Sequence, residues 1–231
     1  MRMSFSGDFF GGIVVIYDIM GFTRFFNQPD VYNYAPRYLN AIGGVISDLL
    51  EAREADWLSE NPYGPHRWDE HLLHRKFMGD GELLVFGTPK GESQTQRIKS
   101  LIHGIFCILR GFDTINARIR DEIPVADLPT GLRFSMSRGT IMKLVPDGGD
   151  REPEYIGFPI TLASRLQSHC RGIRFIASGK VGPRKIRPDA SEYVTMKTRG
   201  LKDFPPELVL LDAASYHALD AAEREALFEE L

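Results

Sequence analysis

A short apolar run, IVVIY, ends on Asp18 near the start of the chain. Its residues are β-branched or aromatic, and glycines lie on both sides of the segment, at Gly12 and Gly21. A run of this length between turn residues predicts a strand over 13–18 that is buried on both faces. Because such a strand must lie inside a covered sheet, the segment limits the chain to a layered architecture. It also raises the question of what the closing carboxylate binds.

Hydrophobic periodicity elsewhere in the chain predicts the helices and strands that pack with this segment. Helical spacing of apolar residues predicts helices over 31–59, 93–121 and 159–170, with a charged helix over 214–231. Two apolar arms around Gly79-Asp80-Gly81 predict a hairpin. GLRFSMSRGTIMKLV predicts two strands around Arg138-Gly139, and IRFIAS, EYVTMK and ELVLLD predict further strands.

This order of elements is an α+β pattern. Helices cover a mainly antiparallel sheet, and the opening βαββαβ is the ferredoxin-like arrangement. We expect a single domain over 1–231, with a core of about 13–212 and a C-terminal helical tail over 213–231.

Charge and composition restrict the partners. The net charge of -3 gives no general attraction to nucleic acid or to an anionic membrane. The basic cluster Arg184, Lys185 and Arg187 lacks interleaved aromatic residues, which favours a solvated loop. No apolar run is long enough to span a bilayer, and two cysteines make no disulfide framework. We therefore expect a cytoplasmic protein with neither a nucleic acid nor a membrane as partner.

Two carboxylates occupy matching places. Asp18 ends the first strand and Asp80 lies at the hairpin tip, and a βαββ unit brings these places to one sheet edge. Asp80 alone is typical of a turn, and Asp18 alone of a helix N-cap. Together they indicate a Mg²⁺-type site of the kind used in phosphoryl transfer. The following turn, Gly21-Phe22-Thr23, would let backbone N–H groups approach a polyphosphate.

Four segments, in order, resemble the motifs of class III nucleotidyl cyclases. They are YDIMGFT, KFMGDG, EYIGFPITLASRL and GLKDFPPELVLLD, and the resemblance spans about 13–212. It implies that Asp18 and Asp80 bind two ions of Mg²⁺ or Mn²⁺, aided by the backbone carbonyl of Ile19. Arg165 would stabilise the pentavalent phosphorus and Lys202 would contact the terminal phosphates. Without the motifs, Arg165 is typical of a helix surface and Lys202 of an exposed turn.

The same resemblance implies how the base and the ribose are held. Lys76 and Glu154 fall at the base-recognition positions, and Thr161 stands where the family has a ribose-orienting asparagine. A hydroxyl offers fewer hydrogen-bonding groups than that amide. Family members are head-to-tail homodimers, in which the metal-binding carboxylates of one chain meet Lys76, Glu154, Arg165 and Lys202 of the other.

The substrate implied is a pyrimidine nucleotide. Lys76 and Glu154 offer one donor and one acceptor, which suit uracil and adenine equally. FMGDGELLVFG with GFPITLASR resembles the pyrimidine cyclases of bacterial antiphage (Pycsar) systems. These convert UTP or CTP to a 3′,5′-cyclic nucleotide and pyrophosphate, and the product activates a separately encoded effector protein. We expect UTP as the substrate.

Other functions remain open. One is an adenylate cyclase that converts ATP to cyclic AMP. Another, of a different class, is a non-catalytic nucleotide sensor with a cyclase fold, for which Thr161 gives some support. Diguanylate cyclases and polymerase palms also carry paired carboxylates on such a sheet, but GGDRE at Gly148 lies in a polar connection without apolar arms.

Overall fold

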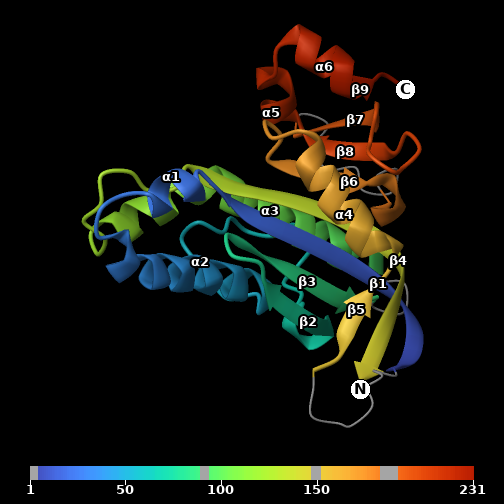
Figure 1. The fold of residues 1–231 in the computed structure, drawn as a ribbon, viewed down its shortest axis with the longest axis horizontal. Coiled ribbons are helices and arrows are strands. Elements are labelled where there is room, and N and C mark those ends of the chain that lie inside the picture. Colours follow the sequence, from blue (N-terminus) through green and yellow to red (C-terminus); the bar gives the residue numbers. More distant parts are fainter. Residues whose placement is uncertain (1–4, 89–93, 147–151, 183–191) are drawn as a thin grey trace.

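A computed structural model describes residues 5–88, 94–146, 152–182 and 192–231 (Figure 1). The basic cluster Arg184, Lys185 and Arg187 lies outside these residues, as does 148–151 of GGDRE. The helices are α1 (Phe22–Phe26), α2 (Ala35–Leu50), α3 (Gln94–Arg120), α4 (Phe158–His169), α5 (Ala213–Ala218) and α6 (Ala221–Leu227). The strands are β1 (Phe5–Met20), β2 (Leu72–Phe77), β3 (Gly81–Gly87), β4 (Gly131–Pro146), β5 (Glu154–Ile156), β6 (Phe175–Ser178), β7 (Tyr193–Thr198), β8 (Leu208–Asp212) and β9 (Phe228–Glu229).

The strands of the described residues form one sheet. Its order is β2-β3-β1-β4-β6-β8-β7-β9, and β5 pairs with β4 beside this path. All pairs are antiparallel except β4 with β6. The part β4-β1-β3-β2, with α2 and α3 as connections, is the ferredoxin-like arrangement, so the predicted fold class is confirmed.

β1 is covered on both faces, as predicted for an apolar run. Ile13, Val15 and Tyr17 pack in the core that contains α2 and α3. Val14 and Ile16 face the other side and pack with Ala163 of α4 and with β3. Figure 1 shows α4 in front of β4 and α3 behind the strands. Because side chains alternate along a strand, Asp18 belongs to the α4 side.

Two central strands are longer than predicted. β1 begins at Phe5 rather than at residue 13, and β4 is one strand where two were predicted around Arg138-Gly139. The two strands pair from Phe5–Pro146 to Met20–Gly131, with Gly12 opposite Gly139. A Cβ on Gly12 would lie 2.4 Å from the Cδ1 atom of Ile141, so this glycine permits close packing inside the ladder. Gly12 and Gly139, which suggested turns, are therefore strand residues.

Two helical segments differ from the sequence-based prediction in where they end. α2 ends at Leu50, well before the predicted residue 59. The tail over 213–231 is α5, α6 and β9 rather than one helix. Asp220 begins α6 by accepting a hydrogen bond from the N–H of Glu223 at 2.7 Å, and Phe228 of β9 is only 2% exposed. The tail thus adds a strand to the sheet, because β9 pairs with β7 and buries Phe228 there.

No helix among the described residues is long and apolar enough to cross a membrane.

Candidate active site

The hairpin tip meets the end of β1. Asp18 pairs with Gly81 in the β1–β3 register, and the N–H of Ile19 donates to the carbonyl of Asp80 at 2.7 Å. A Cβ on Gly81 would lie 1.9 Å from the carbonyl oxygen of Tyr17 and 2.7 Å from the Cα of Asp18. Only glycine allows this approach, and it brings Asp80, in the turn before β3, beside Ile19 near the end of β1.

Asp18 is held by two side chains that sequence reasoning missed. Arg133, its partner in the β1–β4 register, donates to both carboxylate oxygens, from Nε at 3.0 Å and from Nη2 at 2.5 Å. Gln167 of α4 donates from Nε2 to Oδ1 at 2.6 Å. The side chains of Arg133 and Asp18 are 14% and 20% exposed. A planar guanidinium thus holds the carboxylate in a fork in a mostly buried place.

The donor set around Asp18 fits a hard divalent cation. The candidate ligands are the carboxylates of Asp18 and Asp80 and the backbone carbonyl of Ile19, which follows Asp18 in β1. Oxygen donors of this kind suit Mg²⁺ and Mn²⁺, which keep part of their shell for water and substrate phosphate. The guanidinium of Arg133 already neutralises Asp18, so a metal ion would have to displace it or share the carboxylate with it. Within the described residues, no three His, Cys, Asp or Glu side chains gather to form a closed metal cage.

The turn after β1 has the geometry that its glycine suggested. Gly21 has a φ of 81°, in the left-handed region, and α1 begins at Phe22 without a side-chain cap. Phe22 stacks on Phe26 at 5.6 Å between ring centroids. The first N–H groups of α1, including that of Thr23, therefore follow directly after the carboxylate strand.

α4 carries Thr161 and Arg165 on one face, four residues apart. Thr161 is exposed. Arg165 donates from Nη2 to Oδ2 of Asp203 at 2.9 Å, while its Nε has no partner among the described residues. A hollow of about 440 Å³ is lined by Arg165 and Lys202, together with Arg199 and His169. The structure therefore brings Arg165 and Lys202 together in a cationic hollow.

Within one chain, Arg165 and Asp18 lie on opposite sides of α4. Gln167 contacts Asp18, and Arg165 is two residues earlier. Two residues turn an α-helix by about 200°, so Arg165 points away from Asp18, towards Asp203. One chain thus does not bring Arg165 to its own carboxylate pair.

Lys76 and Glu154 lie together on neighbouring elements. The Nζ of Lys76 on β2 is 3.3 Å from Oε2 of Glu154 on β5, and both side chains are about half exposed. Tyr155 ties the same elements together, because its hydroxyl donates to the carbonyl of Leu73 at 3.1 Å. The ring of Tyr155 also lies 4.8 Å from that of His74, measured between centroids. The Lys76–Glu154 pair is therefore accessible, and the strands that carry it are fixed to each other by Tyr155.

The missed residues differ in the signal they leave. Arg133 is a charged residue inside an otherwise apolar strand segment, GLRFSM, and this could have marked it as the partner of a buried acid. Gln167 and Asp203 leave no such signal, because their contacts depend on how α4 packs and how the loop after β7 turns.

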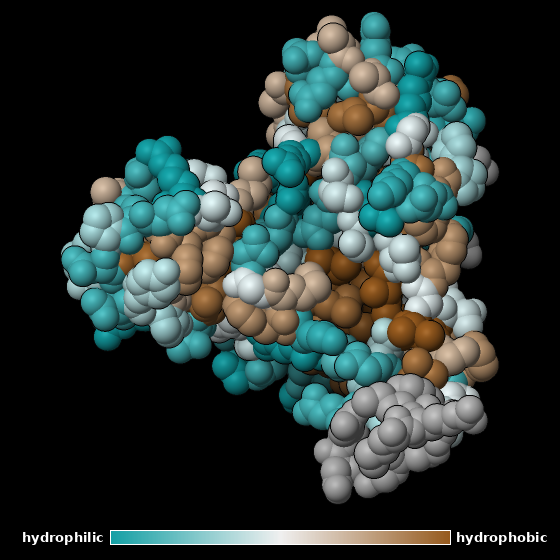
Figure 2. All heavy atoms as spheres, in the orientation of Figure 1, coloured by the Kyte–Doolittle hydropathy of each residue, from teal (hydrophilic) through white to brown (hydrophobic). Residues whose placement is uncertain are grey.

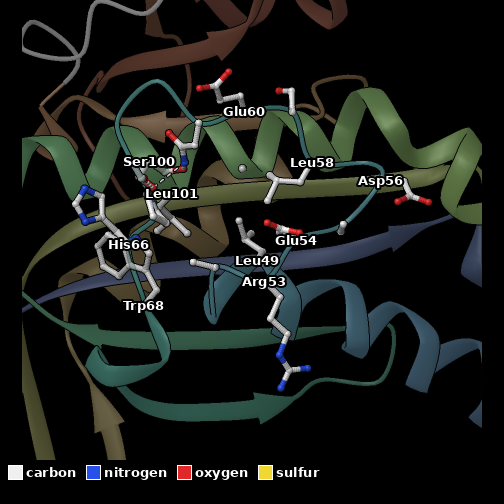
Figure 3. Close-up of a pocket in the computed structure, with 17 residues that line it drawn as sticks. Leu49, Arg53, Glu54, Asp56, Leu58, Glu60, His66, Trp68, Ser100 and Leu101 are labelled. Carbon is white, nitrogen blue, oxygen red and sulfur yellow. Dashed lines mark hydrogen bonds between the residues drawn. The ribbon is translucent and has the colours of Figure 1, made fainter.

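Two further features lie away from these residues. One is a hollow of about 860 Å³ between the end of α2, the 51–68 segment and α3, and Figure 3 shows the residues that line it. Its lining comes from other elements than those that carry Asp18, Asp80 and Arg165, so it is separate from the candidate site. The other is Cys107 on α3, which is 1% exposed.

Cys107 also takes part in a polar network. Its Sγ lies 3.2 Å from the hydroxyl of Ser59 and 3.5 Å from Nε2 of His103. Burial raises the pKa of the thiol, but the hydrogen bonds with His103 and Ser59 lower it more, to about 7.

No protein-family model and no curated protein sequence matches this chain. Solved structures do. The adenylyl cyclase CyaB from P. aeruginosa is 19% identical, with a TM-score of 0.63 over 90% of this chain and 95% of that chain. The guanylyl cyclase Cya2 is 17% identical, with a TM-score of 0.61 over 89% and 92%. The catalytic core of a rhodopsin-guanylyl cyclase with converted specificity, in complex with ATPαS, is 14% identical, with a TM-score of 0.57 over 90% and 98%. The chain therefore has the fold of class III cyclase domains.

Proposed function

We propose that this chain is a nucleotidyl cyclase, a single catalytic domain that converts a nucleoside triphosphate to a 3′,5′-cyclic nucleotide and pyrophosphate. The observation that carries the proposal is the pairing of Asp18 with the Asp80 turn at the end of β1, on a class III cyclase fold. The fold alone allows many functions, whereas two carboxylates at this edge suit in-line attack of the ribose 3′ oxygen on the α-phosphorus.

Asp18, Asp80 and the carbonyl of Ile19 would hold two ions of Mg²⁺ or Mn²⁺. When bound, such ions supply charge neutralisation for the phosphates and lower the pKa of the 3′ hydroxyl. Arg165 and Lys202 would bind phosphate oxygens in their cationic hollow, and Thr161 would orient the ribose from the same face of α4. Backbone N–H groups of Gly21, Phe22 and Thr23 would approach the polyphosphate.

The active form would be a head-to-tail homodimer. Asp18 and Arg165 lie on opposite sides of α4, so a complete site needs Arg165 from a second chain. Large apolar side chains are about half exposed on or directly after β2 and β5, the strands that carry Lys76 and Glu154. They are Leu73, Phe77, Met78, Ile156 and Phe158. Figure 2 shows a hydrophobic hollow beside them, where β1 and β3 pass near α4 and β5. An exposed apolar area of this kind is typical of a protein interface.

The favoured substrate is UTP. Lys76 would donate to O4 of uracil and Glu154 would accept from N3–H. The two groups lie 3.3 Å apart, close enough for both to contact one base edge. CTP presents the opposite groups at these two positions. ATP matches the same pair, so exclusion of adenine would depend on the size of the base pocket. Glu154 is one methylene group longer than aspartate and would make that pocket smaller.

The resemblance to Pycsar cyclases extends this proposal to biology. Cyclic UMP would act as a second messenger in antiphage defence, in the cytoplasm, and would activate a separate effector protein.

The test is incubation of the purified chain with each of the four nucleoside triphosphates and Mn²⁺ or Mg²⁺, with the product identified by mass. We expect cyclic UMP in highest yield, and Asp80→Asn should abolish it while leaving the fold intact. Faster turnover of ATP than of UTP would identify an adenylate cyclase. Stoichiometric nucleotide binding without pyrophosphate release would identify a sensor, and full activity of Asp80→Asn would exclude its metal-binding role.

A matched variant tests the base pocket. Glu154→Asp shortens the acid by one methylene group and keeps its charge, so it should raise the rate with ATP relative to UTP. A change of this size in a pocket is worth roughly 10- to 200-fold in discrimination. An unchanged ratio would show that Glu154 does not set the size of the pocket.

A further inference from the structure

The loop after β7 places an acid in an unusual backbone position. The N–H of Phe204 donates to the carbonyl of Leu201 at 3.1 Å, which closes a turn with Lys202 and Asp203 at its centre. Asp203 has a φ of 65°. Glycine, asparagine and aspartate adopt a positive φ more readily than other residues, so this turn accommodates Asp203.

The turn is anchored on both sides of this acid. Leu201 is only 4% exposed, and the ring of Phe204 packs edge-on against that of Phe158 at 5.0 Å between centroids. Lys202 and Asp203 lie between these anchors, so the direction of both side chains is restricted. Lys202 lines the cationic hollow, and Asp203 contacts Arg165, which lines the same hollow.

The contact of Asp203 is with Arg165. Oδ2 of Asp203 accepts from Nη2 of Arg165 at 2.9 Å, with side chains 61% and 35% exposed respectively. This is a single contact through one nitrogen, whereas phosphate accepts two parallel hydrogen bonds from a guanidinium. A half-exposed ion pair of this kind is weak and readily broken. A phosphate can therefore displace the carboxylate.

The surroundings of this pair are cationic. Arg165, Lys202 and Arg199 line the same hollow, and no Asp or Glu of the described residues lines it. Asp203 lies next to Lys202 in sequence and touches Arg165, so its charge opposes any anion that these two side chains bind. That opposition persists after the carboxylate has been displaced, because the residue stays in its turn.

We propose that Asp203 is an internal competitor that lowers the affinity of this site for phosphate groups. Its carboxylate occupies Arg165 until the substrate arrives, and it favours departure of the pyrophosphate product afterwards. The identity of these phosphates rests on the proposed cyclase function. Competition for Arg165 itself requires only the ion pair and the hollow.

The test uses two variants and a control in the full chain. Asp203→Asn removes the charge with almost no change of shape, and Asp203→Gly suits the positive φ, so both should fold at least as well as the wild type. Asp127→Asn is the control, because Asp127 forms a similar pair with Arg24 at 2.8 Å in another part of the molecule. Thermal unfolding of all four proteins checks the fold.

Calorimetric binding of inorganic tripolyphosphate and of pyrophosphate, without divalent metal, is the deciding measurement. We expect about fivefold tighter binding in both Asp203 variants and no change in Asp127→Asn, since an exposed pair contributes at most about this factor. The difference should shrink as KCl is raised. Binding that is no tighter than that of the wild type, including no binding by any of the proteins, overturns the proposal.

Kinetics separates competition from positioning. Asp203→Asn should lower the KM for the preferred triphosphate and tighten inhibition by pyrophosphate. A fall in kcat with unchanged KM and unchanged pyrophosphate affinity would show instead that Asp203 merely orients Arg165. If the wild type converts none of the four triphosphates, the cyclase function fails, while the tripolyphosphate comparison still decides the competition.

Discussion

Replacement of Arg133 by methionine tests whether Asp18 is a cation-binding carboxylate. The guanidinium makes both hydrogen bonds of the fork, and Gln167 alone would remain on Asp18 in Arg133→Met. Methionine keeps most of the aliphatic stem, so the change removes the charge with little loss of packing. We expect a destabilised chain in which a divalent cation takes over the role of the arginine.

The magnitude follows from burial. Loss of one partner of a fully buried ion pair costs about 3–5 kcal/mol. Here the side chains are 14% and 20% exposed, and Gln167 still donates to the carboxylate, so we expect a loss of about 2–3 kcal/mol in the free energy of unfolding. In the wild type a metal ion must displace Arg133 or share Asp18 with it. Removal of about 2 kcal/mol of competition corresponds to roughly 30-fold tighter metal binding.

Urea unfolding with and without MnCl₂ measures both effects. Mn²⁺ at 100 times its Kd stabilises a chain by about 2.7 kcal/mol, so it should offset most of the loss in Arg133→Met. Calorimetric titration with Mn²⁺ gives the affinity directly. The control is Arg24→Met, which breaks an exposed pair and should change the stability by less than about 1 kcal/mol, with no effect on Mn²⁺ affinity. Equal or weaker Mn²⁺ binding by Arg133→Met would refute the reasoning, because the arginine would then not compete for Asp18.

Three other outcomes are expected. Asp80→Asn chains mixed with Arg165→Ala chains should regain roughly a quarter of wild-type cyclisation, since half of randomly formed dimers contain both chains and each has one intact site; no recovery with heterodimers present would exclude shared sites. Gly81→Ala should lower the free energy of unfolding in urea by about 2–3 kcal/mol, because its Cβ would lie 1.9 Å from a backbone oxygen of β1. Gly44→Ala, where a Cβ would have no atom within 4 Å, should cause no loss. Equal effects of the two substitutions would contradict the close approach. The thiol of Cys107 has a pKa of about 7 in the folded chain, against 9.0 as its ordinary value. Between these two pH values the unfolded chain binds more protons than the folded chain. The contribution of the thiol to stability therefore rises with pH and is lost as pH falls through about 7. In urea unfolding between pH 6.5 and 8.5, the free energy of unfolding should therefore rise by about 2 kcal/mol less in Cys107→Ser than in the wild type. Equal rises would show that the thiol does not titrate in this way.

Much of the fold could be predicted from local pattern. The apolar run before Asp18, the Asp-Gly hairpin and the long helix over 94–120 all depend on residues close in sequence, and the structure contains each of them. Their order was enough to predict the ferredoxin-like half of the sheet. Errors arose at glycines, where the sequence cannot distinguish a turn from a place of close strand packing. Gly139 was read as a turn, and it lies inside β4 opposite Gly12.

The candidate site, like the fold, could be predicted only where it depends on local sequence features. Asp18 and Asp80 could be proposed from the sequence because a strand end and a hairpin tip are local features, and strand pairing then limits where they meet. Their roles as metal ligands stay predictions, as do those of Arg165, Lys76, Glu154, Thr161 and Lys202, which rested on resemblance to family motifs.

Only the tertiary structure decided what surrounds these residues. Arg133 and Gln167 reach Asp18 from 115 and 149 positions away, and Asp203 reaches Arg165 across 38. The register of β1 on β4 sets the first contact, the packing of α4 on the sheet sets the second, and a turn at positive φ sets the third. The sequence by itself determined which elements form and where its acids lie along them. The partners of those acids depend on which faces meet when strands and helices from distant parts of the chain bury their apolar sides together.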